Sequence, residues 1–182
     1  MATMYELIEE TIAKVAPNCS ERDKKSYEDA LKKMLLQGVP FDQAAGLTQE
    51  IKDTLYAYAY RLYGSGKCKD ALLIFSLLST LDNANPTYSF GVAACRHMLK
   101  EYQDALNAYV ACYYMDLNNP LPFYHMSDCY LKLNRPDYAA FSLGMVINIA
   151  GNEPKYAKIK ERAQLTQASL IKGIEQLAAQ NQ

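Results

Sequence analysis

Shifting the sequence against itself by thirty-four residues brings several unlike positions into coincidence. The small residues that coincide are Ala71, Ala105 and Ala139, and the large residues four positions further on are Phe75, Tyr109 and Leu143. Residues four apart lie on the same face of a helix. A period of this length is typical of stacked helix-turn-helix units, each of which buries its apolar face against its neighbours. The sequence therefore predicts an all-α fold.

The period places three helix pairs in the middle of the chain. They are predicted at 50–64 with 68–81, 87–99 with 102–117, and 122–133 with 137–150. Thr48 is a suitable N-cap for the first helix, and Gly64 and Gly66 are suited to end it. Three units are about the minimum for a stable stack.

The units resemble the tetratricopeptide repeat (TPR). The middle unit matches best, because Glu101-Tyr102-Gln103-Asp104-Ala105 occupies the turn and the small position that opens the second helix. Ala59 and Ala93 take the small position of the first helix. The consensus Trp is replaced by Leu55, Ser89 and Phe123, and the helix-ending Pro by Asn83 and Leu117.

Segments on both sides of the repeats are predicted to form helices that flank the stack. Tyr5 to Val15 and Ser20 to Gln37 give an N-terminal helical region over residues 1–47, with a linker at 39–47. The repeats then occupy 48–150. Residues 151–182 are predicted to cap the last repeat with a helix from Lys155 to Ala179. Its expected apolar stripe is Ile159, Leu165, Leu170, Ile174 and Leu177.

Composition argues against several function classes. The net charge is −1, so the chain offers no strong field for nucleic acid or anionic lipid. The acidic N-terminus is unlike a secretory signal, and no stretch reaches the ~20 apolar residues that span a bilayer. Five cysteines without a C-x-x-C pair fit a reducing compartment. We expect a cytoplasmic protein.

Catalytic and metal-binding patterns are not found in the sequence. His97 and His125 are the two histidines, and neither forms a metal motif with the cysteines. Cys95 and Cys129, one repeat apart, are interpreted as small apolar residues between repeats. A basic cluster around Lys155 to Arg162 is interrupted by Glu161 and fits a solvated helix face. We therefore expect no enzyme activity, cofactor or metal.

The first helix of each repeat is expected to line a concave groove. Tyr56, Tyr60 and Tyr63 share one helix face at spacings of four and three. Adding the period gives Phe90, Ala94 and His97, and then Tyr124, Asp128 and Leu131. An aromatic face with almost no charge suits an apolar, extended peptide whose backbone the tyrosine hydroxyls contact.

An aromatic stripe at helical spacing is also what a buried core looks like. The repeat register favours the groove, because the opposite face of the same helices already supplies residues that pack on the second helix. That opposite face comprises Leu55, Ala59, Leu62, Val92, Ala93, Phe123, Met126 and Tyr130.

The stretch from Thr48 to Leu143 resembles the class II chaperones of bacterial type III secretion. The resemblance is carried by Leu55-Tyr56-x-x-Ala59-Tyr60-x-x-Tyr63-x-x-Gly66-Lys67, Ala71-x-x-x-Phe75, Leu81-Asp82, Gly91-x-Ala93-Ala94-Cys95-Arg96, Tyr102-x-x-Ala105-x-x-x-Tyr109, and Pro120 with Phe123-Tyr124-His125-x-x-x-Cys129. It implies a chaperone that holds secreted translocator proteins through a short segment containing proline and leucine.

The resemblance also implies a homodimer through the N-terminal helices. The predicted peptide-binding residues are Tyr56, Tyr60, Tyr63, Leu81, Phe90, Ala94, His97, Tyr124, Asp128 and Leu131. No nucleic acid or membrane is expected among the partners.

Two other binding functions compete with this one. TPR adaptors that capture acidic chaperone tails resemble one another in a Lys/Asn/Arg clamp, whereas Tyr56, Tyr60, Gly91, Leu121 and His125 stand at the clamp positions here. A buried carboxylate would find no cation. A generic adaptor, or a scaffold subunit of a larger assembly, stays open as the alternative.

Overall fold

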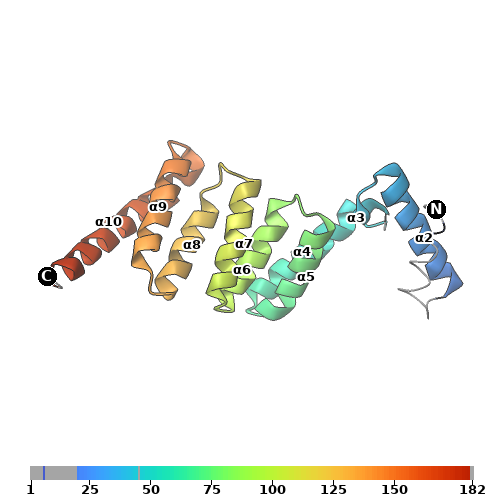
Figure 1. Cartoon of the computed structure of the whole chain (residues 1–182), viewed down its shortest axis with the longest axis horizontal. Coiled ribbons are helices and arrows are strands. Elements are labelled where there is room, and N and C mark those ends of the chain that lie inside the picture. Colours follow the sequence, from blue (N-terminus) through green and yellow to red (C-terminus); the bar gives the residue numbers. More distant parts are fainter. Residues whose placement is uncertain (1–5, 7–19, 45, 181–182) are drawn as a thin grey trace. The chain divides into compact units, whose positions relative to one another are not determined.

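The computed structural model describes residue 6 and residues 20–44 and 46–180, and this part of the chain is helical with turns and no strand. Its elements are α2 (Glu21–Gln37), α3 (Phe41–Ala44), α4 (Gln49–Gly64), α5 (Cys68–Leu81), α6 (Pro86–Met98), α7 (Tyr102–Met115), α8 (Leu121–Lys132), α9 (Pro136–Ala150), a 3-10 turn η1 (Pro154–Tyr156) and α10 (Ala157–Gln180) (Figure 1). The all-α prediction is confirmed, and each of the six repeat helices begins and ends within two residues of its predicted bounds.

The chain divides into two compact units, Met1–Thr54 and Leu55–Gln182. In the first unit, Ser20 caps α2 by accepting a hydrogen bond from the amide of Asp23, and Gly38 ends the helix at a φ of 66°. The predicted linker at 39–47 contains the four-residue helix α3. The predicted helix at Tyr5–Val15 lies outside the described residues.

In the second unit the helices stack in chain order (Figure 1). Each of α5 to α9 packs against the next helix along the chain, and α10 packs against α9. The stack is held by small residues where helices cross, since Ala71, Ala105 and Ala139 are all fully buried. Phe75, Tyr109 and Leu143, one helical turn further on, are buried with them. The coincidences of the repeat therefore mark the core.

The turn between the two helices of each repeat has one backbone geometry in all three units. Gly66, Lys100 and Asn134 each have a left-handed φ, at 79°, 65° and 57°. The amide of each donates to the carbonyl three residues earlier, and the next amide donates to the carbonyl five residues earlier. These bonds satisfy carbonyls that the end of a helix leaves free. Glycine is the residue that most easily adopts this φ, and only the first repeat has it.

An aromatic side chain of each first helix packs on the large buried residue of its own second helix. The ring centroids of Tyr56 and Phe75 are 5.7 Å apart at 64°, and those of Phe90 and Tyr109 are 5.5 Å apart at 64°. In the third repeat, Tyr124 packs against the cluster that contains Leu143. This contact is a repeated part of the core, so the predicted aromatic ladder is not wholly surplus to folding.

The last helix covers the third repeat. Ala163 of α10 is fully buried, Ile159 and Leu170 pack around it, and Gln167 Nε2 donates to the carbonyl of Ala140 at 2.9 Å. Leu165 and Leu177 of the predicted stripe are exposed instead. Leu165 lies on the opposite face of the helix. Leu177 lies near the end of a helix of 24 residues, whereas α9 has 15.

No helix among the described residues is both long enough and apolar enough to cross a membrane.

Candidate functional site

The first helices of the repeats line a pocket of about 390 Å³ together with the end of α7 and the loop that follows it. We call it the first-helix groove. Its lining residues are Tyr56, Tyr60, Tyr63, Phe75, Pro86, Thr87, Phe90, Gly91, Ala94, Cys112, Asp116, Asn119, Leu121 and His125. Five of the predicted peptide-binding residues, Tyr56, Tyr60, Tyr63, Phe90 and Ala94, are thus brought together on one surface.

The three tyrosines of α4 are not equivalent. Tyr60 is 61% exposed and stacks on Tyr56 with ring centroids 6.3 Å apart. Tyr56 contacts Phe75 and also lies 6.0 Å from Tyr88, so it belongs to the core and to the groove at once. Tyr63 packs on the first-repeat core. Burial raises the pKa of both Tyr56 and Tyr63, so their hydroxyls stay protonated and able to donate.

The floor of the groove depends on a glycine. A Cβ atom added to Gly91 would lie 2.6 Å from the ring of Phe75, much closer than packed atoms approach each other. Both residues line the groove. The ring of Phe75 therefore occupies space on α6 that only a residue without a side chain leaves open.

Beside the groove residue His125, whose ring is 6.2 Å from that of His97, α6 and α8 are joined by a polar contact. His97 Nε2 lies 2.8 Å from Asp128 Oδ2. The hydroxyl of Tyr109, from α7, lies 3.5 Å from His97 Nδ1. The sequence predicts His97 and Asp128 as separate peptide contacts in successive repeats, and the structure pairs them with each other. Neither is among the residues that line the pocket.

His125 lines the groove although the period did not select it. It stands 34 residues after Gly91, at the same position of its repeat. Its ring lies parallel to that of Tyr109, with centroids 5.5 Å apart and planes at 11°, and edge-on to Phe90. Burial, helped by His97 and opposed by Asp128, lowers the pKa of His125.

Besides His97 and Asp128, three more predicted residues lie outside the groove lining. Leu81 is 9% exposed and closes α5 as part of the core. Tyr124 packs toward α9 and α10 through the third core cluster. Leu131 is 37% exposed near the end of α8. Their assignment as peptide-binding residues stays a prediction.

Loop and turn residues could not be found from helical periodicity. Asp116 and Asn119 reach the groove from the segment between α7 and α8. Pro86 and Thr87 belong instead to the first turn of α6, four and three residues before Phe90, where helical spacing continues the same face. Asn119 accepts a hydrogen bond from the amide of Leu121 at 3.0 Å, which fixes the start of α8. A turn signal, Asn118-Asn119-Pro120, marks this loop in the sequence but says nothing of its direction.

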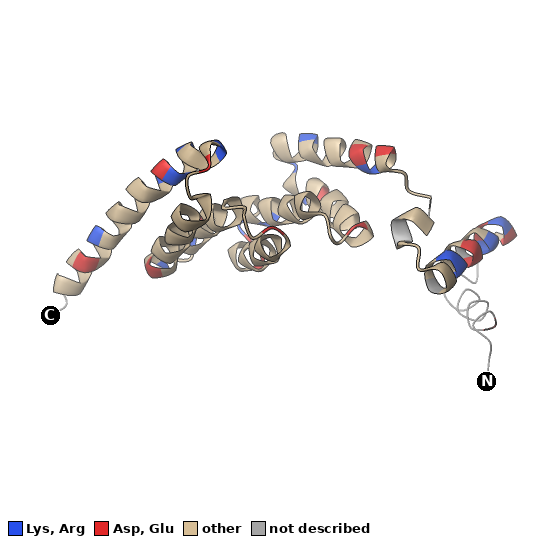
Figure 2. Ribbon diagram, turned by 90° about the horizontal axis from the view of Figure 1, so that it is seen from above, with Lys and Arg blue, Asp and Glu red and all other residues tan. Residues whose placement is uncertain are grey.

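The groove has little charge. Its lining contains one acid, Asp116, and no lysine or arginine. Figure 2 likewise shows long uncharged stretches along the repeat helices. A surface of aromatic rings with a few polar groups suits an apolar segment more than a charged one.

The cysteines of the repeats do not form a reactive or metal-binding site. Cys68, Cys95, Cys112 and Cys129 are buried free thiols. Burial raises the pKa of Cys95, Cys112 and Cys129 to about 12, so they remain protonated. No group of three or more metal-ligating side chains occurs among the described residues. The thiols pack as small apolar residues.

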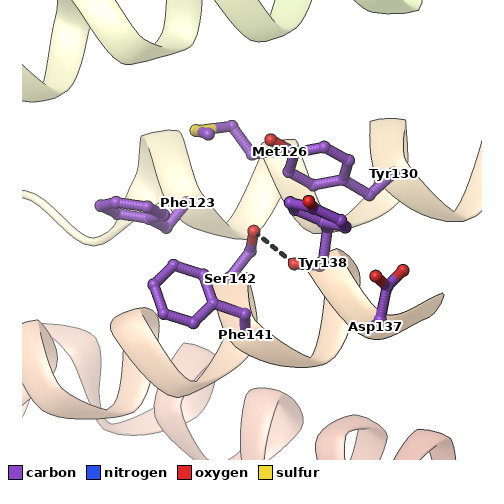
Figure 3. Close-up of a pocket in the computed structure, with 7 residues that line it drawn as sticks. All are labelled: Phe123, Met126, Tyr130, Asp137, Tyr138, Phe141 and Ser142. Carbon is purple, nitrogen blue, oxygen red and sulfur yellow. Dashed lines mark hydrogen bonds between the residues drawn. The ribbon is translucent and has the colours of Figure 1, made fainter. Parts of the chain in front are cut away.

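A second pocket, of about 460 Å³, lies between α8 and α9 and contains none of the predicted site residues (Figure 3). Its wall is formed by the face of α8 opposite to the groove and by Tyr138 and Phe141 of α9. Ser142 turns its hydroxyl back to the carbonyl of Tyr138 at 2.8 Å. The residues that line it are Phe123, Met126, Tyr130, Asp137, Tyr138, Phe141 and Ser142.

This chain is similar to known proteins in both sequence and structure. Residues 53–85 and 87–118 match the family model of the tetratricopeptide repeat. The low calcium response locus protein H of Yersinia pseudotuberculosis is 25% identical over 140 residues, which are 77% of this chain and 83% of that protein.

Two solved structures are similar over most of their length. SycD of Yersinia enterocolitica, a type III secretion chaperone in complex with a peptide of the translocator YopD, is 25% identical with a TM-score of 0.65 and covers 68% of this chain and 95% of its own. PcrH of Pseudomonas aeruginosa, in complex with the chaperone binding region of PopD, is 31% identical with a TM-score of 0.67. That match covers 69% of this chain and 95% of PcrH.

The chain belongs to the class II type III secretion chaperones, the translocator chaperones. The resemblance inferred from the motifs between Thr48 and Leu143 is confirmed. Within this translocator chaperone, the TPR units that the family model matches carry α4 to α7, and these helices supply ten of the fourteen residues that line the first-helix groove.

Proposed function

We propose that this translocator chaperone binds an extended apolar segment of a translocator protein in the first-helix groove and keeps that protein soluble before export. The observation that carries the proposal is the groove itself, which exposes Tyr60 among other aromatic side chains and contains no cation. PcrH and SycD bind segments of PopD and YopD, and their similarity to this chain supports the same class of client.

The composition of the groove disfavours capture of an acidic tail. A client carboxylate placed beside Asp116 would lose hydration without gaining a positive partner. An extended apolar segment gains more, because rings cover its side chains and the hydroxyls of Tyr56 and Tyr63 donate to its backbone. The predicted proline-and-leucine motif has these properties.

The division of labour along the chain is part of the proposal. Residues 48–150 bind the client, residues 151–182 cap the last repeat, and residues 1–47 mediate homodimerisation. The protein acts in the bacterial cytoplasm and has no catalytic role. Its relatives are named as chaperones, which supports this assignment.

Fluorescence anisotropy with labelled synthetic peptides tests the client class. The peptides are the chaperone binding region of PopD and the YopD segment held by SycD, and an acidic peptide of equal length is the control. Saturable one-to-one binding of a translocator peptide, with none of the acidic control, is expected. No saturable binding of either translocator peptide up to roughly 100 μM, a free energy near −5.5 kcal/mol, would overturn the proposal.

Light scattering tests the assembly. We expect the free protein to interconvert between monomer and dimer and the loaded protein to be a one-to-one complex, because an empty apolar groove is a surface that favours self-association. A dimer that remains intact with two bound clients contradicts this part.

A further inference from the structure

The polar cluster beside the groove residue His125 is arranged around His97. Its Nε2 lies 2.8 Å from Asp128 Oδ2, and its Nδ1 lies 3.5 Å from the hydroxyl of Tyr109. Tyr109 is fully buried, and burial raises its pKa, so its hydroxyl keeps the proton. A hydroxyl that donates to Nδ1 leaves the imidazole proton on Nε2, which donates to Asp128. Both nitrogens of His97 therefore have partners within the protein.

His125 is held in place by rings alone. Its imidazole is parallel to Tyr109, edge-on to Phe90, and 6.2 Å from the ring of His97. Among the described residues none forms a hydrogen bond with its ring nitrogens. These contacts fix the plane of the imidazole without satisfying its donor or its acceptor.

The unpaired nitrogen atoms of His125 reach the groove. No fully buried side-chain nitrogen or oxygen among the described residues lacks a hydrogen-bond partner. The nitrogens of His125 lack one, so they are not fully buried, and the residue lines the groove. A rigid donor is thus presented to whatever lies in the groove.

We propose that His125 is the polar anchor of the groove, and that its ring N–H donates a hydrogen bond to a backbone carbonyl of the bound client. This inference rests on the proposed function. An extended segment has no internal partners for its carbonyls, and a carbonyl covered by an apolar groove without a partner costs free energy. The imidazole, clamped between Tyr109 and Phe90, supplies the partner without losing side-chain freedom on binding.

The anchor makes client binding sensitive to acid. The titratable groups around His125 are His97 on α6, Tyr109 on α7, Tyr124 and Asp128 on α8, and Asp116 at the groove wall. Burial and His97 hold the pKa of His125 below its ordinary value, and Asp128 opposes them. A client that covers the ring removes more water and lowers this pKa further.

The sign of the effect follows from the lower pKa in the complex. Above the pKa that His125 has in the free protein, His125 is neutral in both the free protein and the complex, and the affinity is constant. Below it, the free protein takes up a proton that the complex excludes, so the affinity falls as the pH falls, by up to about tenfold per pH unit. We expect the loss to begin below about pH 6.5.

Two substitutions separate the hydrogen bond from the ring contacts. His125→Phe keeps a flat ring against Tyr109, but the phenylalanine side chain has no hydrogen-bond donor and does not titrate. His125→Gln keeps a hydrogen-bond donor in a side chain that does not titrate. The probe is the labelled PopD chaperone binding region, and its affinity is measured at pH 7.5 and pH 5.5, with the thermal midpoint of each variant recorded.

At pH 7.5, His125→Phe is expected to bind about two- to tenfold more weakly than wild type, which is the range for one hydrogen bond. His125→Gln should recover part of that loss, and both variants should lose the weakening between pH 7.5 and pH 5.5. If His125→Phe does not fold, the pH profile of His125→Gln decides alone, because an unchanged acid sensitivity overturns the inference.

The outcomes distinguish this inference from the proposed function. Wild type that fails to bind the probe removes both. Wild type that binds, with His125→Phe equal to it at both pH values, removes the anchor and leaves the groove assignment standing.

Discussion

The ring of Phe75 lies directly on the backbone of Gly91, where an added Cβ atom would be 2.6 Å away. This contact joins α5 of the first repeat to α6 of the second, and both residues line the groove. Phe75 is buried on its other sides, so it has little room to move. The shape of the groove and the stacking of the repeats therefore both depend on the contact between Phe75 and Gly91.

Gly91→Ala should destabilise the protein by about 1–3 kcal/mol, because the methyl group overpacks a core that does not yield. Chemical denaturation measures the change. Gly173→Ala is the matched control: nothing lies within 4 Å of its added Cβ, and a helical glycine replaced by alanine is expected to gain about 0.5–1 kcal/mol. Equal effects of the two substitutions would contradict the contact.

Ala105→Leu should lower stability by roughly 1–3 kcal/mol or more, since Ala105 is fully buried where α6 and α7 approach. Asn107→Leu adds similar bulk on the exposed side of the same helix and should leave the thermal midpoint nearly unchanged. A midpoint for Ala105→Leu that matches wild type would show that the helices do not cross at this position.

Tyr60→Ala should weaken client binding by about 2 kcal/mol, or roughly thirtyfold, with little loss of stability, because its ring is exposed in the groove. Tyr56→Ala should lower both binding and stability, since that ring also contacts Phe75 and Tyr88.

Tyr58→Ala serves as the control for both tyrosine variants. Tyr58 is 47% exposed on the same helix, carries Arg61 over its ring, and is not part of the groove. We expect wild-type affinity for a translocator peptide. A Tyr60→Ala protein that binds as well as Tyr58→Ala, or one that unfolds, would remove Tyr60 from the client site.

Cys95, Cys112 and Cys129 should resist iodoacetamide at pH 8 in the folded protein and react in urea. Burial raises the pKa of each thiol to about 12, well above that of an unfolded cysteine, so the thiolate that reacts is suppressed by folding. The same shift means that stability is lost as the pH rises above about 9, where the unfolded thiols ionise. Mass spectrometry of tryptic peptides measures the labelling, and rapid modification of Cys95 under native conditions would contradict its burial.

The period predicted the helices well because packing imposes it. Ala71, Ala105 and Ala139 must be small, and a large residue must follow one turn later, so both the fold class and the helix bounds could be read from the sequence. The left-handed turn residues were harder to predict. Gly66 is a residue type that indicates a positive φ, whereas Lys100 and Asn134 adopt the same geometry without such a signal.

The groove could be predicted only in part. Adding the period to Tyr56 and Tyr60 found Phe90 and Ala94, because α4 and α6 present the same face. It did not find the lining residue of α8, which is His125, whereas the residue it selected there, Tyr124, packs toward the last helix. The neighbour of a terminal repeat is a cap instead of another repeat, so its side chains meet different partners.

The recurring turn geometry fixes the rotational position at which side chains of the first helices face the groove. Gly66, Lys100 and Asn134 end the first helix of each unit at the same backbone position, so Tyr60 and Ala94 emerge at the same angle around successive helices. One residue inserted within α6 would rotate the side chains before the insertion by about 100° around the helix axis relative to the side chains after it. The loop after Leu81 absorbs an insertion without such a rotation. Changes of length should therefore be tolerated between repeats and not within their first helices, which keeps the peptide-facing side chains in line.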